Sequence, residues 1–517
     1  DAAAVVRAGN AANATLSVSG NDSAITLVNT GAASTSVGVP ANGSAHTLTL
    51  NASEIVLGGG TQKILGYGEV NMTAANRIFV AGPGSLTLGA GADVVNLYLA
   101  TQNVLVGGAT ASGGGSFAVT TSGNIVLSDI LQRDPSLPRR PADSAETGGK
   151  LSLTGADILI SGIMQAQAGT ITLNATAADV RLTSRAYLAA GGYKKSLLDV
   201  DTYLSGGKVV LKSDNGSIYA DTLSIIDVAQ PADESGNRFG YGGEIEATAL
   251  NGNATFDGKL LGAGGPGLGG RFKLDVKGSA DLTSLADRLF DGGVFGAIDI
   301  RTRTGNLELS ENHTLKAHAV TLTADDTTWG NDPSQQFGQI KIRGRIDATG
   351  HGGDTLDGSG RAGGRVGLYA ANSVLLAGSG VIDASTTNAD ERGGDVTIGI
   401  SWAAKSKIFL QQGTQINVSG GSRGGLSGGT VTFRAPLDGN NDVKIAVLKK
   451  EPNSSGTFDE LPDIDATNDI NDRSKVGIIG ARSVAVNGFI AFDTKASSAG
   501  IDGSSLGWAG IIDTAGW

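Results

Sequence analysis

One short phrase recurs along the chain: two glycines, one variable residue, and then an apolar, a variable and an apolar position. In a strand, such alternation points one set of side chains inward and the other outward. The phrase therefore predicts a short, half-buried strand directly after each glycine pair. Its copies begin at Gly114, Gly148, Gly206, Gly269, Gly363, Gly393 and Gly428.

A second phrase lies between the later copies of the first and consists of a brief apolar alternation that ends in a polar turn. It reads Ile346-Asp347-Ala348-Thr349, then Ile382-Asp383-Ala384-Ser385, then Ile416-Asn417-Val418-Ser419. The glycine pairs that begin at Gly363, Gly393 and Gly428 are 30 and 35 residues apart. These segments are too short for the crossover helices that usually join parallel strands.

Strands of this kind can pair in parallel, one repeat apart, when the chain coils around a common axis. We therefore expect an all-β fold, a long parallel β-helix with glycine, asparagine and aspartate in its turns, where positive φ is tolerated. Coils of roughly 22–26 residues would give about 20 coils and a rod on the order of 100 Å long. An antiparallel β-sandwich array is the alternative, although its tight two-residue hairpin turns are not seen.

The expected organisation is one continuous solenoid with two regions. Residues 1–330 form coils with irregular insertions, and residues 331–517 form regular coils with a long loop at 436–475. Leu282, Leu285, Ala286, Leu289 and Phe290 have helical spacing and predict one short amphipathic helix on the rod. Insertions that should protrude from the rod are 132–147, 191–204, 227–241, 281–295, 325–337 and 436–475. We expect any local function on these insertions, chiefly 132–147, 227–241 and 436–475.

Composition narrows the class of protein. The chain has 80 Gly but only 11 Pro, with 40% hydrophobic and 17% charged residues, which argues against collagen and against disorder. There is no cysteine, the net charge is −11, and no basic stripe or long apolar run is visible. Nucleic-acid binding and membrane insertion are therefore not expected. Because the chain opens on Asp1 without a basic leader, we interpret it as an internal or processed piece of a longer protein.

Residues 338–493 resemble large exoproteins of the filamentous-haemagglutinin family. The resemblance rests on the two phrases above and on the segments Val431-Thr432-Phe433-Arg434-Ala435-Pro436, Asn441-Asp442-Val443 and 480–489. It implies a right-handed parallel β-helix, export by an outer-membrane transporter (two-partner secretion), and a place outside the cell or on its outer surface. It also implies a non-catalytic adhesin or structural fibre of a Gram-negative bacterium, which binds a host or bacterial surface glycan or protein in attachment, aggregation or biofilm. Because the ends of a β-helix expose unpaired strand edges, self-association into filaments is a further expectation. The family's Asn-Pro-Asn secretion motif is missing, since no Asn-Pro pair occurs.

The alternative function is a β-helix enzyme that degrades polysaccharides, a glycosidase or lyase. Asp325-Asp326 and, 25 residues on, Gly350-His351-Gly352 are similar to two of the motifs of polygalacturonase-like enzymes. Paired carboxylates can supply the general acid and base of inverting glycoside hydrolysis. The family's Asn-Thr-Asp and Arg-Ile-Lys motifs are missing, so Asp325, Asp326 and His351 are alternative catalytic candidates only.

No cofactor is expected, and calcium is the metal for which the sequence offers candidates. Asp354 and Asp357 follow a Gly-Gly pair in a pattern similar to a calcium-binding nonapeptide, which occurs only once here. Asp463, Asp465 and Asp469 lie in the acidic part of the 436–475 loop, without the central glycine of an EF-hand. Solvated acidic side chains are the simpler interpretation of both groups.

Overall fold

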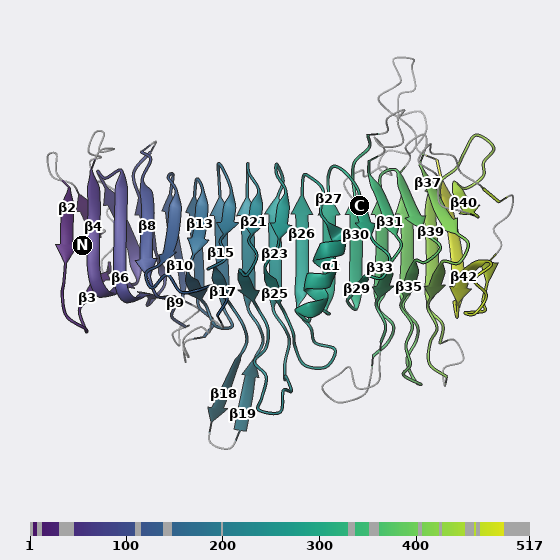
Figure 1. Cartoon of the computed structure of the whole chain (residues 1–517), viewed down its shortest axis with the longest axis horizontal. Coiled ribbons are helices and arrows are strands. Elements are labelled where there is room, and N and C mark those ends of the chain that lie inside the picture. The colour runs from purple at the N-terminus through teal and green to yellow at the C-terminus, as the bar shows by residue number, and fades with distance from the viewer. Residues whose placement is uncertain are drawn as a thin grey trace, which may run out of the picture.

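The alternating strands pair in parallel with their counterparts one coil along, and the computed structural model is an elongated parallel β-helix (Figure 1). This confirms the predicted all-β class. The structure describes residues 4–7, 13–29, 46–91, 93–108, 115–137, 147–197, 200–328, 337–350, 361–401, 406–422, 427–449, 460–461 and 466–490.

Sheet A has 15 strands and is the continuous wall of the rod. Each coil contributes to it one strand, and the strands following the glycine pairs belong to this sheet. In spatial order they are β1 (Ala4–Arg7), β5 (Gly60–Leu65), β7 (Gly84–Leu88), β10 (Ser116–Thr121), β12 (Lys150–Gly155), β15 (Thr170–Ala175), β20 (Lys208–Ser213), β23 (Glu244–Ala249), β26 (Arg271–Val276), β27 (Ala297–Thr302), β30 (Ala319–Ala324), β33 (Arg365–Ala370), β36 (Asp395–Ile400), β39 (Thr430–Pro436) and β43 (Ser483–Phe489).

Sheet B, also of 15 strands, forms the other two walls of the first half. The long strands β4 (Thr47–Leu57) and β6 (Glu69–Val80) belong to both walls, and β2 (Ala14–Ser17) and β3 (Ala24–Leu27) pair with β4. One wall continues through β8 (Asn96–Thr101), β11 (Ile125–Asp129), β13 (Ile158–Ser161), β16 (Val180–Leu182), β21 (Ile218–Ala220) and β24 (Ala254–Phe256). The other continues through β9 (Val104–Val106), β14 (Ile163–Gln165), β17 (Tyr187–Ala189), β22 (Ile225–Asp227) and β25 (Lys259–Leu261).

In the second half the same two walls are separate sheets. Sheet C contains β28 (Leu307–Leu309), β31 (Gln339–Ile342), β34 (Ser373–Leu376), β37 (Lys407–Gln411) and β40 (Ile445–Leu448). Sheet D contains β29 (Thr314–Lys316), β32 (Arg345–Asp347), β35 (Val381–Asp383), β38 (Gln415–Asn417), β42 (Val476–Ile479) and β41 (Ala466–Thr467).

The helix α1 (Leu282–Asp291) lies where sheet B ends and sheets C and D begin (Figure 1). It packs against β25, β28 and β29, so it takes the place of two strands within one coil. The side chain of Asp281 accepts a hydrogen bond from Ser284 N at 3.0 Å and caps the helix. Leu285 and Leu289 are buried, whereas Phe290 is 45% exposed. The predicted helix is confirmed, but it forms part of the stack instead of lying on it.

Rows of inward side chains fill the interior along the rod axis. One row of sheet A, in which every member is at most 2% exposed, runs through Leu151, Ile171, Val209, Ile245, Phe272, Ile298, Val320, Val366, Val396 and Val431. Burying such aliphatic side chains stabilises the fold by about 1.5–3 kcal/mol each. The rod is therefore held by a continuous apolar column.

Among the described glycine pairs of the recurring phrase, only Gly148 has the predicted positive φ (81°), and the others are needed for a different reason. Gly394 and Gly429 do not have positive φ. Instead, their backbones lie against the coil below: a Cβ on Gly394 would be 2.0 Å from the carbonyl oxygen of Gly364, and one on Gly429 would be 1.8 Å from that of Gly394. Any side chain there would overlap the neighbouring coil, so the phrase marks close stacking of backbones.

The coils vary in length more than the sequence suggested. Sheet A partners are 20 residues apart from Lys150 to Thr170, but 53 residues apart from Thr430 to Ser483. The described residues place 15 strands in sheet A, against about 20 predicted coils, because the insertions lengthen many of the coils. With 15 strands in sheet A, the described rod is about 70 Å long.

Two predicted loops contain strands. The segment 436–475 includes β40 and β41, because the apolar run at Ile445–Leu448 extends sheet C by pairing with β37. The segment 191–204 folds as an antiparallel hairpin of β18 (Tyr193–Leu197) and β19 (Val200–Leu204), which protrudes from the rod (Figure 1). Within the described residues, no helix has the length and apolar character to span a membrane.

Candidate binding surface on the loop edge

Several insertions leave the rod at one edge (Figure 1). Each follows a strand of the wall that contains β17, β22 and β25 and precedes the next strand of sheet A. We call this the loop edge and define it by the hairpin β18–β19 and the loops 228–243 and 262–270. Backbone hydrogen bonds join the three segments, from Gly206 N to Tyr241 O at 2.9 Å and from Gly242 N to Leu268 O at 2.8 Å. The segments therefore form one layered surface, and the coils below fix their spacing.

The buried side chain of Gln230 links the hairpin to the 228–243 loop. Its Nε2 donates to the carbonyl oxygen of Leu204 at 2.5 Å and to that of Tyr241 at 3.3 Å. A Cβ on Gly192 would be 2.5 Å from the Gln230 side chain, so glycine at that position makes room for it. Gln230 thus holds the base of the hairpin against the loop.

The loop edge carries three aromatic residues, Tyr203 on the hairpin and Phe239 and Tyr241 on the 228–243 loop, which we call its aromatic cluster. The rings of Tyr203 and Phe239 are 4.9 Å apart between centroids and tilted by 41°. Phe239 is 39% exposed and Tyr241 57% exposed. Exposed aromatic side chains on protruding loops are typical of binding surfaces, since their ring faces remain available to a partner.

An ion pair borders the cluster on the hairpin. Lys194 Nζ lies 2.8 Å from an oxygen of Asp201 and 5.9 Å from the ring centroid of Tyr203. The hydrogen bond that Lys194 donates to the Asp201 carboxylate raises the pKa of Lys194. The two opposite charges compensate each other because the groups are in contact. Both side chains are also more than one-third exposed, so they remain accessible to polar groups of a ligand.

Asp227 lies at the foot of the 228–243 loop and fixes where that loop leaves the rod. Its carboxylate accepts hydrogen bonds from Ala229 N at 2.9 Å and from the Tyr187 hydroxyl at 3.0 Å. Burial raises the pKa of Asp227, although these hydrogen bonds and the nearby charge of Arg238 act in the opposite direction. The carboxylate is therefore a partly desolvated anchor of the loop.

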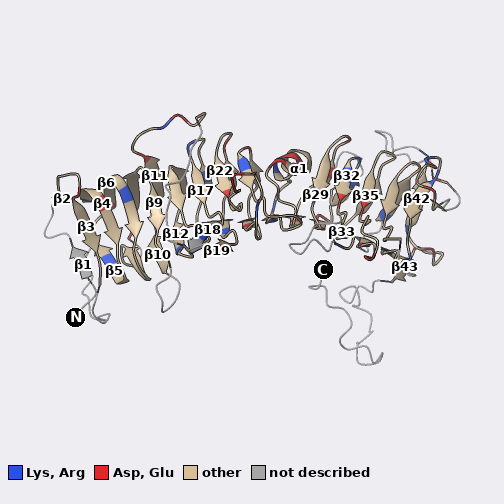
Figure 2. Cartoon of the chain, turned by 90° about the horizontal axis from the view of Figure 1, so that it is seen from below, with Lys and Arg blue, Asp and Glu red and all other residues tan. Residues whose placement is uncertain are grey.

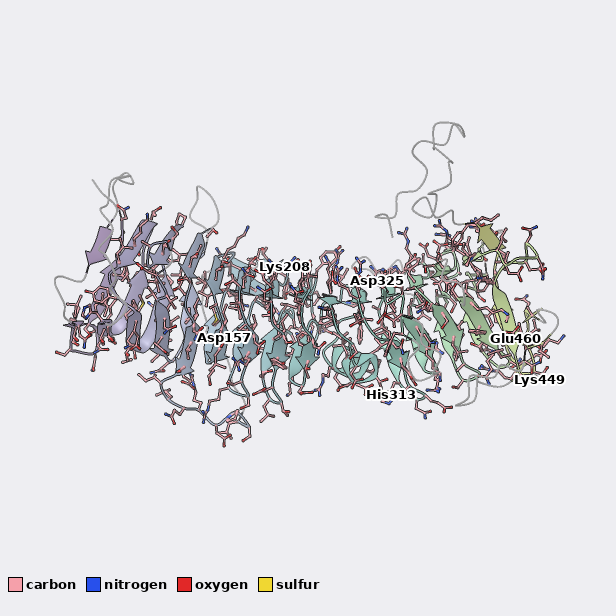
Figure 3. All side chains as sticks on the ribbon, turned by 90° about the horizontal axis from the view of Figure 1, so that it is seen from above. Asp157, Lys208, His313, Asp325, Lys449 and Glu460 are labelled. Atoms are coloured by element: carbon pink, nitrogen blue, oxygen red, sulfur yellow. The ribbon has the colours of Figure 1, made fainter. Side chains whose placement is uncertain are left out.

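The predicted catalytic aspartates have structural partners. Asp325 forms an ion pair with Arg301 at 2.5 Å. Asp326 is only 8% exposed, and its two oxygens accept from Gly305 N at 2.9 Å and Thr328 N at 2.8 Å, which holds a turn. His351 lies outside the described residues. Figure 3 shows Asp325 on the same side of the rod as Lys208, which is on sheet A.

The predicted calcium ligands are mostly outside the described residues, namely Asp354, Asp357, Asp463 and Asp465. Asp469 is exposed, and its carboxylate accepts a hydrogen bond from Asn471 N at 2.9 Å within a turn. Among the described residues, no group of three His, Asp or Glu side chains is arranged to hold a metal ion.

The outer face of sheet A carries charged side chains of both signs that pair across neighbouring strands. Lys208 Nζ contacts Glu244 at 3.0 Å and Glu246 at 2.6 Å, and Arg303 contacts Asp275 at 2.8 Å. In Figure 2 the ribbon positions of Lys and Arg (blue) and of Asp and Glu (red) are scattered among those of the other residues (tan). These oppositely charged side chains neutralise each other, so the ion pairs described on this face do not form a patch of one charge that would select a ligand.

Comparison of the chain with protein-family models, with curated proteins and with solved structures finds no match.

Sequence reasoning named the 227–241 insertion as a place for function, but it did not identify the aromatic cluster. The signal was present, because aromatic residues make up only 5% of the chain and all three members of the cluster fall in the predicted insertions 191–204 and 227–241. Tyr203 and Phe239 are 36 residues apart, and only the coiling of the chain brings their rings together.

Proposed function

We propose that the chain is the non-catalytic rod of a secreted bacterial surface protein of the filamentous-haemagglutinin type, acting in attachment, aggregation or biofilm matrix. Export would use an outer-membrane transporter, and the partner would be a glycan or protein of a host or bacterial surface. The parallel β-helix and the phrases in residues 338–493 are consistent with this class. Assembly of rods into filaments belongs to the same proposal.

The observation that carries the proposal is the display of the aromatic cluster on the loop edge of a stiff rod. Parallel coils with a continuous apolar column resist bending, so loops on one edge keep fixed positions. Phe239 and Tyr241 are exposed on a protruding loop, and such loops carry a large share of the binding residues of proteins. In contrast, the described aspartates that the enzymatic alternative requires, Asp325 and Asp326, hold an ion pair and a turn.

Attachment and turnover should be measured on the same preparation. Beads coated with the purified chain should attach to bacterial or epithelial cells, whereas beads coated with albumin should not. Acidic and neutral polysaccharides incubated with the chain should release no new reducing ends. Release of ends that is abolished by Asp325→Ala or Asp326→Ala would overturn the non-catalytic assignment in favour of a polysaccharide-degrading enzyme.

A further inference from the structure

We propose that the aromatic cluster on the loop edge binds a neutral glycan, with sugar rings stacked on the side chains of Phe239 and Tyr241. This inference rests on the proposed adhesive function and deepens it by naming the site and the ligand class. Tyr203 supports Phe239 from the hairpin, at 4.9 Å between ring centroids. Its contact holds the Phe239 ring in place before a ligand arrives.

The chemistry of the exposed rings suits a sugar. The C–H face of a pyranose is apolar and its rim is polar, so it can cover an aromatic ring while its hydroxyls remain hydrogen bonded. Phe239 and Tyr241 are 39% and 57% exposed, which leaves ring surface available for such stacking. At the border of the cluster, the Lys194–Asp201 pair offers both a donor and an acceptor to sugar hydroxyls.

The size of the cluster favours a small ligand over a protein. A stable protein interface buries about 800 Å² on each partner. An entire aromatic side chain buries about 150–250 Å², and the three rings of the cluster are already partly covered. The rings by themselves are therefore too small for a stable protein interface, whereas two or three sugar units can stack on them.

The charge of the surface favours a neutral glycan. The described charged residues of the hairpin and of the 228–243 loop are three cations, Lys194, Lys195 and Arg238, and three anions, Asp201, Asp233 and Glu234. They add up to no positive patch, and the whole chain has a net charge of −11. A sulfated or uronic-acid polysaccharide would therefore be repelled at long range.

The test is isothermal titration calorimetry on the full chain at 0.15 M NaCl. The probes are hexasaccharides of β-1,4-glucose, α-1,4-glucose, β-1,4-mannose and β-1,4-N-acetylglucosamine, with heparin and polygalacturonate as anionic comparisons. At least one neutral probe should bind, and Phe239→Ala and Tyr241→Ala should each weaken that binding by about tenfold or more. Tyr219→Ala is the matched control, because Tyr219 is 38% exposed on β21, away from the loop edge, and its removal should change nothing.

Three results would overturn the inference: no neutral probe binds, the anionic probes bind instead, or Tyr219→Ala weakens binding as much as the loop variants. Thermal melting of each variant separates loss of the site from loss of the fold. If no oligosaccharide binds but coated beads still attach to cells, the glycan inference fails while the adhesive function stands, with a protein receptor. If beads do not attach either, the proposed function itself fails.

Discussion

Single glycines set how closely the coils approach. Gly364, Gly394 and Gly429 stack on one another at the start of three successive sheet A strands, and each leaves no room for a Cβ on the next. The sequence predicted where these glycines would be needed. The predicted reason, a positive φ, was wrong for these three glycines. A positive φ is a property of one residue, whereas glycine is required here because the carbonyl oxygen of a residue about 30 positions earlier lies where a Cβ would be.

Gly394→Ala should destabilise the rod by about 1–3 kcal/mol, because the new methyl group forces the backbone of its own coil or of the coil below to move. Thermal melting followed by circular dichroism measures the effect. Gly439→Ala is the matched control, since a Cβ there has no atom within 4 Å and its φ is not positive. Equal melting temperatures for the two variants would contradict close backbone stacking.

Asp227 predicts a pH dependence at the foot of the binding loop. Burial raises the pKa of Asp227 in the folded chain, so folding favours the protonated carboxyl. The resulting contribution to the stability of the fold is fully present below the usual pKa of an aspartate, and it is lost as the pH rises through the raised pKa. Asp227→Asn should therefore melt about 1–2 °C higher than the natural chain at pH 7, and the gain should shrink at acid pH. A gain that is independent of pH would show that Asp227 is not desolvated in the fold.

Whole elements were predictable where their apolar period was clear. Helical spacing located α1, and the glycine-pair phrase located strands such as β36 and β39. The strand β40 was missed because Ile445–Leu448 is one short apolar run in a polar insertion, with no period of its own. The hairpin β18–β19 was missed because its strands pair with each other and not with the coils.

The helix α1 should contribute to stability through its buried face, because it fills the gap between sheet B and sheets C and D. Leu289→Ala should cost about 2–5 kcal/mol, since Leu289 is 1% exposed. Phe290→Ala, one position along and 45% exposed, should cost far less. Denaturant unfolding measures the free energy of unfolding of the two variants. If both lost a similar amount of stability, α1 would lie on the rod surface and not within the stack.

At the scale of the whole molecule, sheet A is continuous from β1 to β43, whereas the other two walls change sheets at α1. This change falls at residues 282–291, within the 1–330 region for which irregular insertions were predicted. The rod therefore presents its loop edge on one unbroken support. Binding by the chain should depend on that edge and be indifferent to the flat walls.

Attachment of coated beads by two multiple variants tests this claim most directly. The first replaces Tyr203, Phe239 and Tyr241 by alanine on the loop edge, and the second replaces Tyr98 and Tyr219, each 38% exposed on the walls of sheet B. With both variants folded, the account predicts that the first loses attachment to cells and the second keeps it. Equal attachment by the two variants, or loss confined to the second, would contradict it.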